Sequence, residues 1–164
     1  MRNYDLITPE GTKDLLFGEC IIRRDIENTL LDLFKSRGYC EMITPGLEFF
    51  DVFNLNSQYF PQENLYKLTD SKGRLLVMRP DSTMPIARVV ATRLRDAVLP
   101  LKLCYNQPVY STEPALKGRS DEIVQAGIEL IGSQLKMADL EVISTAADSL
   151  KSFGMEFSLE IGHI

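Results

Sequence analysis

Residues 122–132 constrain the fold of this chain more than any other stretch. Read alternately, as the two faces of a β-strand, one face carries only apolar side chains. The other face carries Gln125, Gly127 and Glu129. A glycine between an amide and a carboxylate leaves room for a ligand against the sheet, although a solvated face with a glycine bulge gives the same pattern. The apolar face consists of Val124, Ala126, Ile128 and Leu130.

Composition and charge narrow the class of protein. The chain has 164 residues, enough for one domain with a core, and a net charge of -5. It shows no secretion signal, and no apolar run approaches the roughly 20 residues that span a bilayer. Its cysteines form no C-x-x-C pair, and only His163 could join them around a metal. We therefore expect a cytoplasmic protein with free thiols, no metal site and no membrane segment, and the acidic charge argues weakly against nucleic acid.

A helix and an interrupted strand come early in the chain. Apolar residues recur at intervals of three and four over residues 18–37, and Gly38 stands where a left-handed residue ends a helix. Residues 39–48 read as a strand that breaks at Pro45, so it belongs at an edge or where pairing changes. Three phenylalanines follow, which either form an exposed apolar surface or fill the core beneath the helix. They are Phe49, Phe50 and Phe53.

Turn and cap residues predict the remaining elements. Gly73 lies in a polar run between two apolar stretches, which indicates a hairpin. Asp81, Ser82 and Thr83 are good helix caps, and Pro85 suits a first turn. Because nothing follows the last strand to cover it, we expect a truncated chain. The predicted elements are a hairpin of residues 66–68 and 75–78, helices at 83–95 and 138–153, a polar loop at 113–120, and strands at 101–112, 121–132 and 157–161.

Several spaced motifs resemble class II aminoacyl-tRNA synthetases of the histidyl subgroup. Residues 38–48 resemble motif 1, and residues 109–132 resemble the motif 2 strand-loop-strand. Residues 79–83, Arg-Pro-Asp-Ser-Thr, are similar to the subgroup's Arg-Pro-Glu-Gly-Thr segment, and residues 9–14 match its N-terminal signature. The resemblance implies an α+β fold, a class II antiparallel sheet flanked by helices. Residues 1–164 would form the N-terminal portion of the core domain, without motif 3.

Two families share this pattern. One is histidyl-tRNA synthetase, and the other is its catalytically silent paralogue, the regulatory subunit of the short-form ATP phosphoribosyltransferase, which starts histidine biosynthesis. The synthetase grips the α-phosphate of ATP with a motif 2 arginine, where this chain has Ser111. A hydroxyl cannot replace a bidentate cation, and such a loss commonly costs about 100-fold or more in rate. Asp81 and the ending at residues 160–163 also resemble the regulatory subunit. The remnant of the ATP site is Ser111, Glu113 and Arg119.

The positions of the family's histidine pocket are kept. By the resemblance, Asp81, Thr83, Gln125 and Glu129 contact the amino acid, with Gly127 as the pocket floor. Gln125 and a carboxylate handle the α-amino group, and Glu129 faces the imidazole. A zwitterion with a cationic amine needs buried acceptors, and a pocket that would leave them unpaired rejects analogues. A kept pocket beside a damaged ATP site indicates a histidine sensor without catalytic residues or a cofactor.

The resemblance implies a non-catalytic regulatory subunit that partners the short catalytic phosphoribosyltransferase and carries feedback by histidine. Class II domains pair through motif 1, so we expect a homodimer through the surface around Pro45, Phe49 and Phe50, and we do not expect tRNA as a ligand. Two alternatives stay open. One is a histidyl-tRNA synthetase fragment or divergent homologue, and the other is a synthetase-like interaction module without a ligand.

Overall fold

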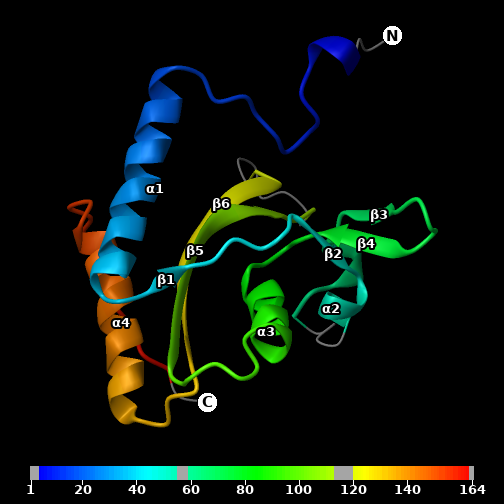
Figure 1. Cartoon of the computed structure of the whole chain (residues 1–164). Coiled ribbons are helices and arrows are strands. Elements are labelled where there is room, and N and C mark those ends of the chain that lie inside the picture. Colours follow the sequence, from blue (N-terminus) through cyan, green and yellow to red (C-terminus); the bar gives the residue numbers. More distant parts are fainter. Residues whose placement is uncertain (1–3, 55–58, 113–119, 163–164) are drawn as a thin grey trace.

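Two long antiparallel strands form the centre of the computed structural model (Figure 1). They are β5 (Leu101–Tyr110) and β6 (Glu122–Ile131). Their side chains alternate between two faces, as the sequence predicts, because both strands keep one register from end to end. The structure describes residues 4–54, 59–112 and 120–162.

The described strands form two three-stranded sheets, with strand orders β1-β5-β6 and β2-β4-β3. β1 pairs with β5 in parallel, whereas β2 pairs with β4 antiparallel. The predicted strand over residues 39–48 is therefore two short strands in different sheets. The crossover, residues 42–46, joins them, and Pro45 lies where the pairing changes, as the sequence predicts. The strands are β1 (Cys40–Glu41), β2 (Leu47–Phe49), β3 (Lys67–Thr69) and β4 (Leu75–Met78).

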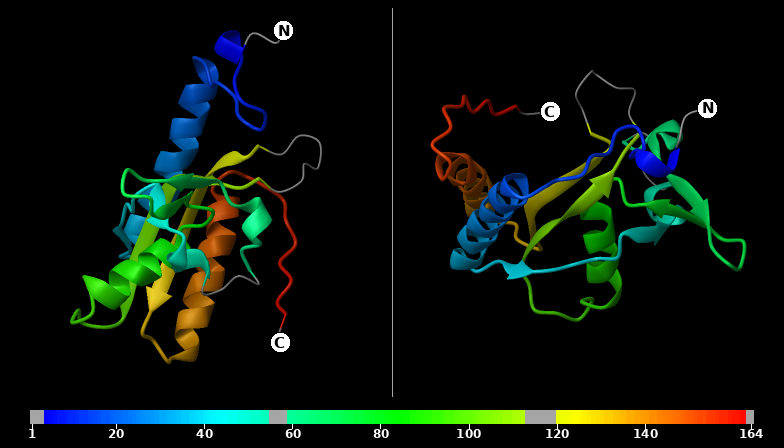
Figure 2. Two further views of the ribbon diagram at one scale, coloured as in Figure 1. Left: turned by 90° about the vertical axis from the view of Figure 1, so that its right-hand side faces the viewer. Right: turned by 90° about the horizontal axis from the view of Figure 1, so that it is seen from above.

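Helices cover both faces of the β5–β6 pair. α1 and α4 lie on one face and α3 on the other (Figures 1 and 2). Phe34 and Cys104 are buried on the first face, and Ile86 packs with Leu103 and Tyr105 on the second. Within the described ranges, no helix is long and apolar enough to cross a membrane. The helices are α1 (Gly18–Ser36), α2 (Asp51–Asn54), α3 (Thr83–Thr92) and α4 (Lys136–Lys151), with 3-10 turns at Tyr4–Leu6 and Gln62–Asn64.

Several local predictions are confirmed and one is wrong. Gly38 and Gly73 have φ values of 83° and 76°, so glycine ends α1 and turns the β3–β4 hairpin. α3 is shorter than predicted, and α4 begins and ends two residues earlier than predicted. The strand predicted at residues 157–161 does not form: residues 155–162 have no regular structure. An alternating pattern makes a strand only beside a partner, and none of the described strands pairs with this segment.

The three phenylalanines after the crossover have different environments. Phe53 is fully buried with Leu65 and Val77, beneath the second sheet and not beneath α1. Phe49 keeps 44% of its surface exposed, and the centroid of its ring lies 4.8 Å from Cζ of Arg74. Phe50 is half-buried. The core interpretation therefore applies to Phe53, and the surface interpretation to Phe49.

Candidate functional site

Four polar side chains meet where α3 begins beside strand β6. The Ser82 amide donates to Oε1 of Gln125 at 3.0 Å, and Nε2 of Gln125 donates to Oδ2 of Asp81 at 3.2 Å. Oδ1 of Asp81 accepts from the Thr83 amide at 2.7 Å, and the Thr83 hydroxyl donates to Oε1 of Glu129 at 2.8 Å. We call Asp81, Thr83, Gln125 and Glu129 the polar cluster. The four predicted pocket residues thus lie together on one face of the sheet.

Two local features of the sequence bring this cluster together: the capping residues at the start of α3 and the alternation of side chains along β6. Ser82 is the N-cap residue of α3, and the carboxylate of Asp81, one residue earlier, accepts from the amides of Thr83 and Met84 in the first turn. Pro85 follows where a missing N–H costs nothing. The period of two in β6 puts Gln125 and Glu129 on the α3 face. A slip of one residue would turn both side chains toward α1 and destroy the cluster.

Tyr105 occupies the space above Gly127. A Cβ added to Gly127 would lie 2.5 Å from the Tyr105 hydroxyl oxygen, so any larger residue there would displace this ring. Burial, with the charges of Glu129 and Asp81, raises the pKa of Tyr105 to about 12. Bare glycine is therefore not the floor that a ligand would meet: the phenol covers it. The sequence analysis did not identify Tyr105 as a residue of this site. Its place opposite Gly127 becomes visible only when the register between β5 and β6 is known.

The polar cluster is acidic and half-buried: Asp81, Gln125 and Glu129 are partly covered, and Thr83 is exposed. Burial chiefly raises the pKa of Glu129; the negative charge of Asp81 adds to the rise, and the hydrogen bond from Thr83 opposes it. Within the described residues, neither carboxylate forms an ion pair. The same part of the chain holds no group of three His, Cys, Asp or Glu side chains arranged for a metal. Such a cluster suits a ligand that brings an ammonium group and N–H donors.

Glu129→Gln is expected to raise the thermal stability of the protein at neutral pH. Since the pKa of Glu129 is raised on folding, its stabilising contribution is complete below the unfolded pKa and is lost as pH rises through the folded pKa. Glutamine keeps an acceptor for Thr83 and carries no charge. Thermal melting should show a higher Tm for the variant at pH 7 and a smaller gain near about pH 4, close to the usual glutamate pKa. An equal gain at both pH values would contradict this account.

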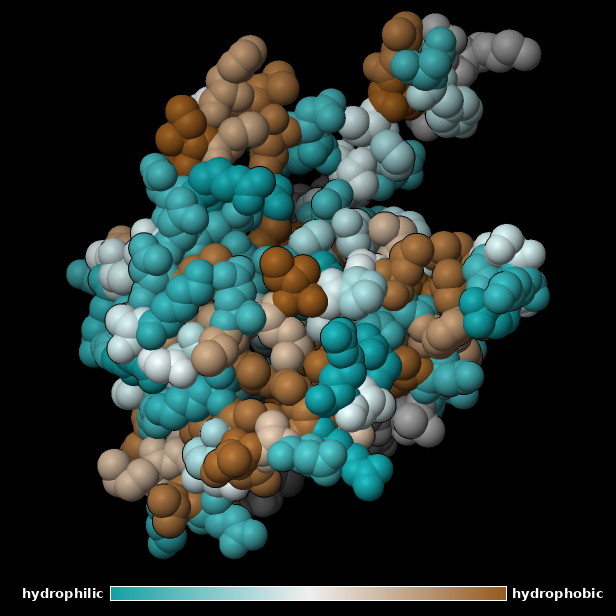
Figure 3. Space-filling model, in the orientation of Figure 1, coloured by the Kyte–Doolittle hydropathy of each residue, from teal (hydrophilic) through white to brown (hydrophobic). Residues whose placement is uncertain are grey.

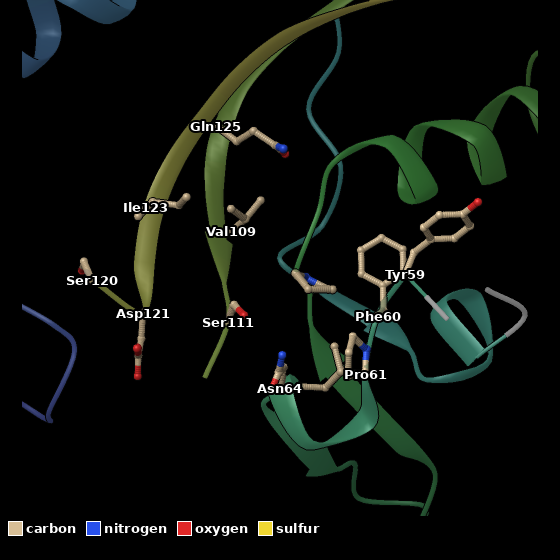
Figure 4. Close-up of a pocket in the computed structure, with 12 residues that line it drawn as sticks. Tyr59, Phe60, Pro61, Asn64, Val109, Ser111, Ser120, Asp121, Ile123 and Gln125 are labelled. Atoms are coloured by element: carbon tan, nitrogen blue, oxygen red, sulfur yellow. The ribbon is translucent and has the colours of Figure 1, made fainter. Parts of the chain in front are cut away.

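A cavity of about 220 Å³ adjoins the polar cluster and shares Gln125 with it. In Figure 4, Val109 and Gln125 point from the two strands toward Phe60, which lies with Tyr59 on the opposite wall. The cavity therefore lies between the β5–β6 pair and the segment that leads into β3. Its mixed apolar and amide lining gives a small organic ligand both contact area and hydrogen bonds.

Ser111 and Asp121 close the far end of this cavity. The Ser111 amide donates to the Asp121 carbonyl at 2.9 Å. None of the described residues that line the cavity is a lysine or an arginine, so the lining offers no cation to a phosphate. Glu113 and Arg119, the other predicted remnants of an ATP site, lie outside the described residues.

A turn near the N-terminus braces the same end of the cavity. The carbonyl of Gly11 accepts from the Asp121 amide at 2.7 Å and from the Ser120 hydroxyl at 2.7 Å. The Asp121 carboxylate accepts from the Tyr66 hydroxyl at 2.6 Å, which is the main reason that the pKa of Tyr66 is raised to about 12. Gly11 has a φ of 76°, and a Cβ there would lie 2.3 Å from Cγ of Asp121, so this turn requires glycine.

A family model described as histidyl-tRNA synthetase matches residues 11–164. The chain belongs to the histidyl-tRNA synthetase family. A structure from Bacillus halodurans, titled an ATP phosphoribosyltransferase regulatory subunit/histidyl-tRNA synthetase, matches 95% of this chain and 40% of its own, with a TM-score of 0.84 and 34% identity. The apo histidyl-tRNA synthetase of S. aureus matches 91% of this chain and 35% of its own, with a TM-score of 0.77 and 28% identity.

Several curated relatives of this chain are named as regulatory subunits. The protein of Clostridium kluyveri named ATP phosphoribosyltransferase regulatory subunit is 48% identical over 99% of this chain and 42% of its own length. The protein of the same name from Clostridium acetobutylicum is 47% identical over 100% of this chain and 40% of its own length. The chain thus spans about two fifths of the length of these relatives. The predicted family and its class II fold are confirmed.

Proposed function

We propose that this protein is a non-catalytic regulatory subunit of the short-form ATP phosphoribosyltransferase, the first enzyme of histidine biosynthesis. It acts in the cytoplasm, forms a hetero-oligomer with the catalytic subunit and carries feedback by histidine. One observation carries the proposal: an acidic polar cluster suited to histidine adjoins one end of a cavity whose far end holds Ser111, at the position where the synthetase motif has a phosphate-binding arginine. The name of the curated relatives supports it.

Histidine fits the chemistry of the polar cluster. Its ammonium group brings three donors, and Asp81, Gln125 and Thr83 present acceptor oxygens to them. Glu129 accepts from an imidazole N–H in this arrangement, close to the Tyr105 phenol. Charge-assisted hydrogen bonds of this kind are about twice as strong as neutral ones. An analogue that leaves one of these half-buried carboxylates unpaired binds less well, which makes the site selective.

We also propose that two copies pair through the crossover and strand β2. Ile43 is 76% exposed, and Leu47 and Phe49 keep nearly half of their surfaces in water. In Figure 3, brown apolar atoms gather where the crossover runs across this face. Exposed apolar side chains of this kind are characteristic of an interface, and a twofold pair of identical surfaces is the usual arrangement.

Adding the full-length protein to a short-form catalytic subunit is expected to give a phosphoribosyltransferase that histidine inhibits. The same protein should give no histidine-dependent ATP–pyrophosphate exchange, because the arginine that grips the α-phosphate is missing at Ser111. Both assays use purified proteins, with an authentic histidyl-tRNA synthetase as the positive control for exchange. Exchange at the rate of that control would support the synthetase alternative instead. No effect on the catalytic subunit and no exchange would support the interaction module.

A further inference from the structure

A buried guanidinium belongs to Arg79, two residues before Asp81 of the polar cluster. Arg79 is only 3% exposed, and among the described residues its donors reach neutral oxygens alone. Nε donates to the Pro108 carbonyl at 2.7 Å, and Nη1 donates to the carbonyls of Thr44 at 2.6 Å and Pro45 at 3.1 Å. Nη1 also donates to Oε1 of Gln107 at 3.0 Å. Burial lowers the pKa of Arg79, yet arginine stays charged, so these acceptors are what makes a buried cation tolerable.

The backbone of Arg79 is fixed on both sides as well. Its amide donates to the Gly46 carbonyl at 3.0 Å, and its carbonyl accepts from the Tyr110 amide at 3.0 Å. Side chain and backbone together therefore tie the crossover to the end of β5. Pro80 follows and restricts the conformation of Arg79, and the next residue is Asp81 of the polar cluster. Asp81 therefore lies only two residues along the backbone from an anchored residue.

Gln107 connects Arg79 to Gln125, which lies on β6 in the polar cluster. Its Oε1 accepts from the Thr44 amide at 3.1 Å as well as from Arg79, and its Nε2 donates to the Thr44 hydroxyl at 3.1 Å. Gln107 is also the direct partner of Gln125 in the β5–β6 register. Side chains of such a pair start about 5 Å apart on the same face, so the place of one restricts the other.

We propose that Arg79, acting with Gln107 and Thr44, is the positioning residue of the polar cluster. It holds Asp81 and Gln125 in the arrangement that a ligand needs and fixes that arrangement to the crossover. The inference rests on the proposed function for the ligand, histidine. It has a consequence for the crossover, where we expect two copies to pair: a change at Thr44 is felt at the polar cluster, although Thr44 has no hydrogen bond to it in the described structure.

Thr44→Val tests this role, because valine keeps the shape and removes the hydroxyl that Gln107 and Arg79 reach. The readout is hydrogen exchange, by mass spectrometry, in the peptide that holds the Ser82 and Thr83 amides. These amides donate to Gln125 and Asp81, so their protection reports the polar cluster directly. Losing one buried hydrogen bond is worth about 1–1.5 kcal/mol, so we expect roughly tenfold faster exchange there, with a several-fold loss of histidine affinity in full-length protein.

Thr145→Val is the matched control. Thr145 is a fully buried threonine on α4, across the sheet, and its hydroxyl also accepts from an arginine, Arg37, at 2.7 Å. This variant should lower Tm and leave the Ser82 and Thr83 amides and the histidine affinity unchanged. Equal effects of both variants, or normal protection of these amides in Thr44→Val, would overturn the positioning role.

A second variant and the wild type separate this inference from the proposed function. Arg79→Lys removes the guanidinium fork, and we expect it to expose the Ser82 and Thr83 amides more than Thr44→Val does. If that variant does not fold, the hydrogen-exchange data for Thr44→Val still test whether Arg79 positions the polar cluster. If wild-type protein binds no histidine, the sensor proposal fails, whereas the amide protection continues to report whether Arg79 positions Asp81 and Gln125.

Discussion

Glu129→Ala is expected to weaken histidine binding by about tenfold or more in the full-length protein. The variant removes a half-buried carboxylate that accepts a charge-assisted hydrogen bond, and each such contact is worth about 1.5–3 kcal/mol. Gln125→Ala should cause a loss of the same order, because the amide group holds Asp81 and the Ser82 amide in place. Isothermal titration calorimetry measures both affinities against wild type.

Glu122→Ala is the control on the same strand. Glu122 is exposed at the start of β6, and its carboxylate accepts a long hydrogen bond, 3.4 Å, from the Tyr110 hydroxyl. Its loss should leave histidine affinity unchanged. Unchanged affinity in both Glu129→Ala and Gln125→Ala would remove the sensor role from this site and would place histidine control elsewhere, for instance at the interface with the catalytic partner.

Ile43→Asp is expected to convert a full-length dimer largely into monomers. Ile43 is 76% exposed, and Leu47, Phe49 and Leu75 are each more than 40% exposed nearby in the chain or in its paired strands. A carboxylate buried without a partner against apolar surface costs several kcal/mol, so the dissociation constant should rise on the order of 100-fold. Sedimentation velocity over a range of concentrations measures the change.

Ile21→Asp provides the comparison for that experiment. Ile21 is 64% exposed on α1, far along the chain from the crossover, so the same change of chemistry should leave the dimer intact. The full-length protein is needed, because an open edge such as that of β6 can pair artificially in a fragment. Wild-type protein that stays monomeric at high concentration would rule out pairing through the crossover.

The parts of the fold that the sequence predicted depend on local rules. Gly38 and Gly73 take the left-handed conformation that their positions suggested, and Pro45 marks a change of sheet because proline has no N–H for a ladder. The alternation around Gly127 places Gln125 and Glu129 on one face. Each of these predictions depends only on the type of residue, its neighbours in the chain and the alternation of side chains along a strand.

The features that the sequence did not reveal depend on contacts between distant segments. Tyr105 lies over Gly127 because the register of β5 and β6 sets these two residues opposite each other. The burial of Arg79 follows from acceptors that belong to the crossover and to β5. Conversely, residues 157–161 alternate as a strand should, yet the predicted strand does not form. Alternation gives a segment an apolar face, but a strand also needs a neighbouring strand to pair with.

The brace between Gly11 and Ser120 also sets an order of events during synthesis of the chain. The acceptor at Gly11 emerges 109 residues before the hydroxyl that it will bind. Closing such a long loop carries an entropic cost that is recovered only once β6 has paired with β5. We therefore expect the far end of the cavity to form late, after the polar cluster has a sheet to rest on. A nascent chain that ends before β6 would lack Gln125 and Glu129, so the polar cluster can form only after β6 has been synthesised.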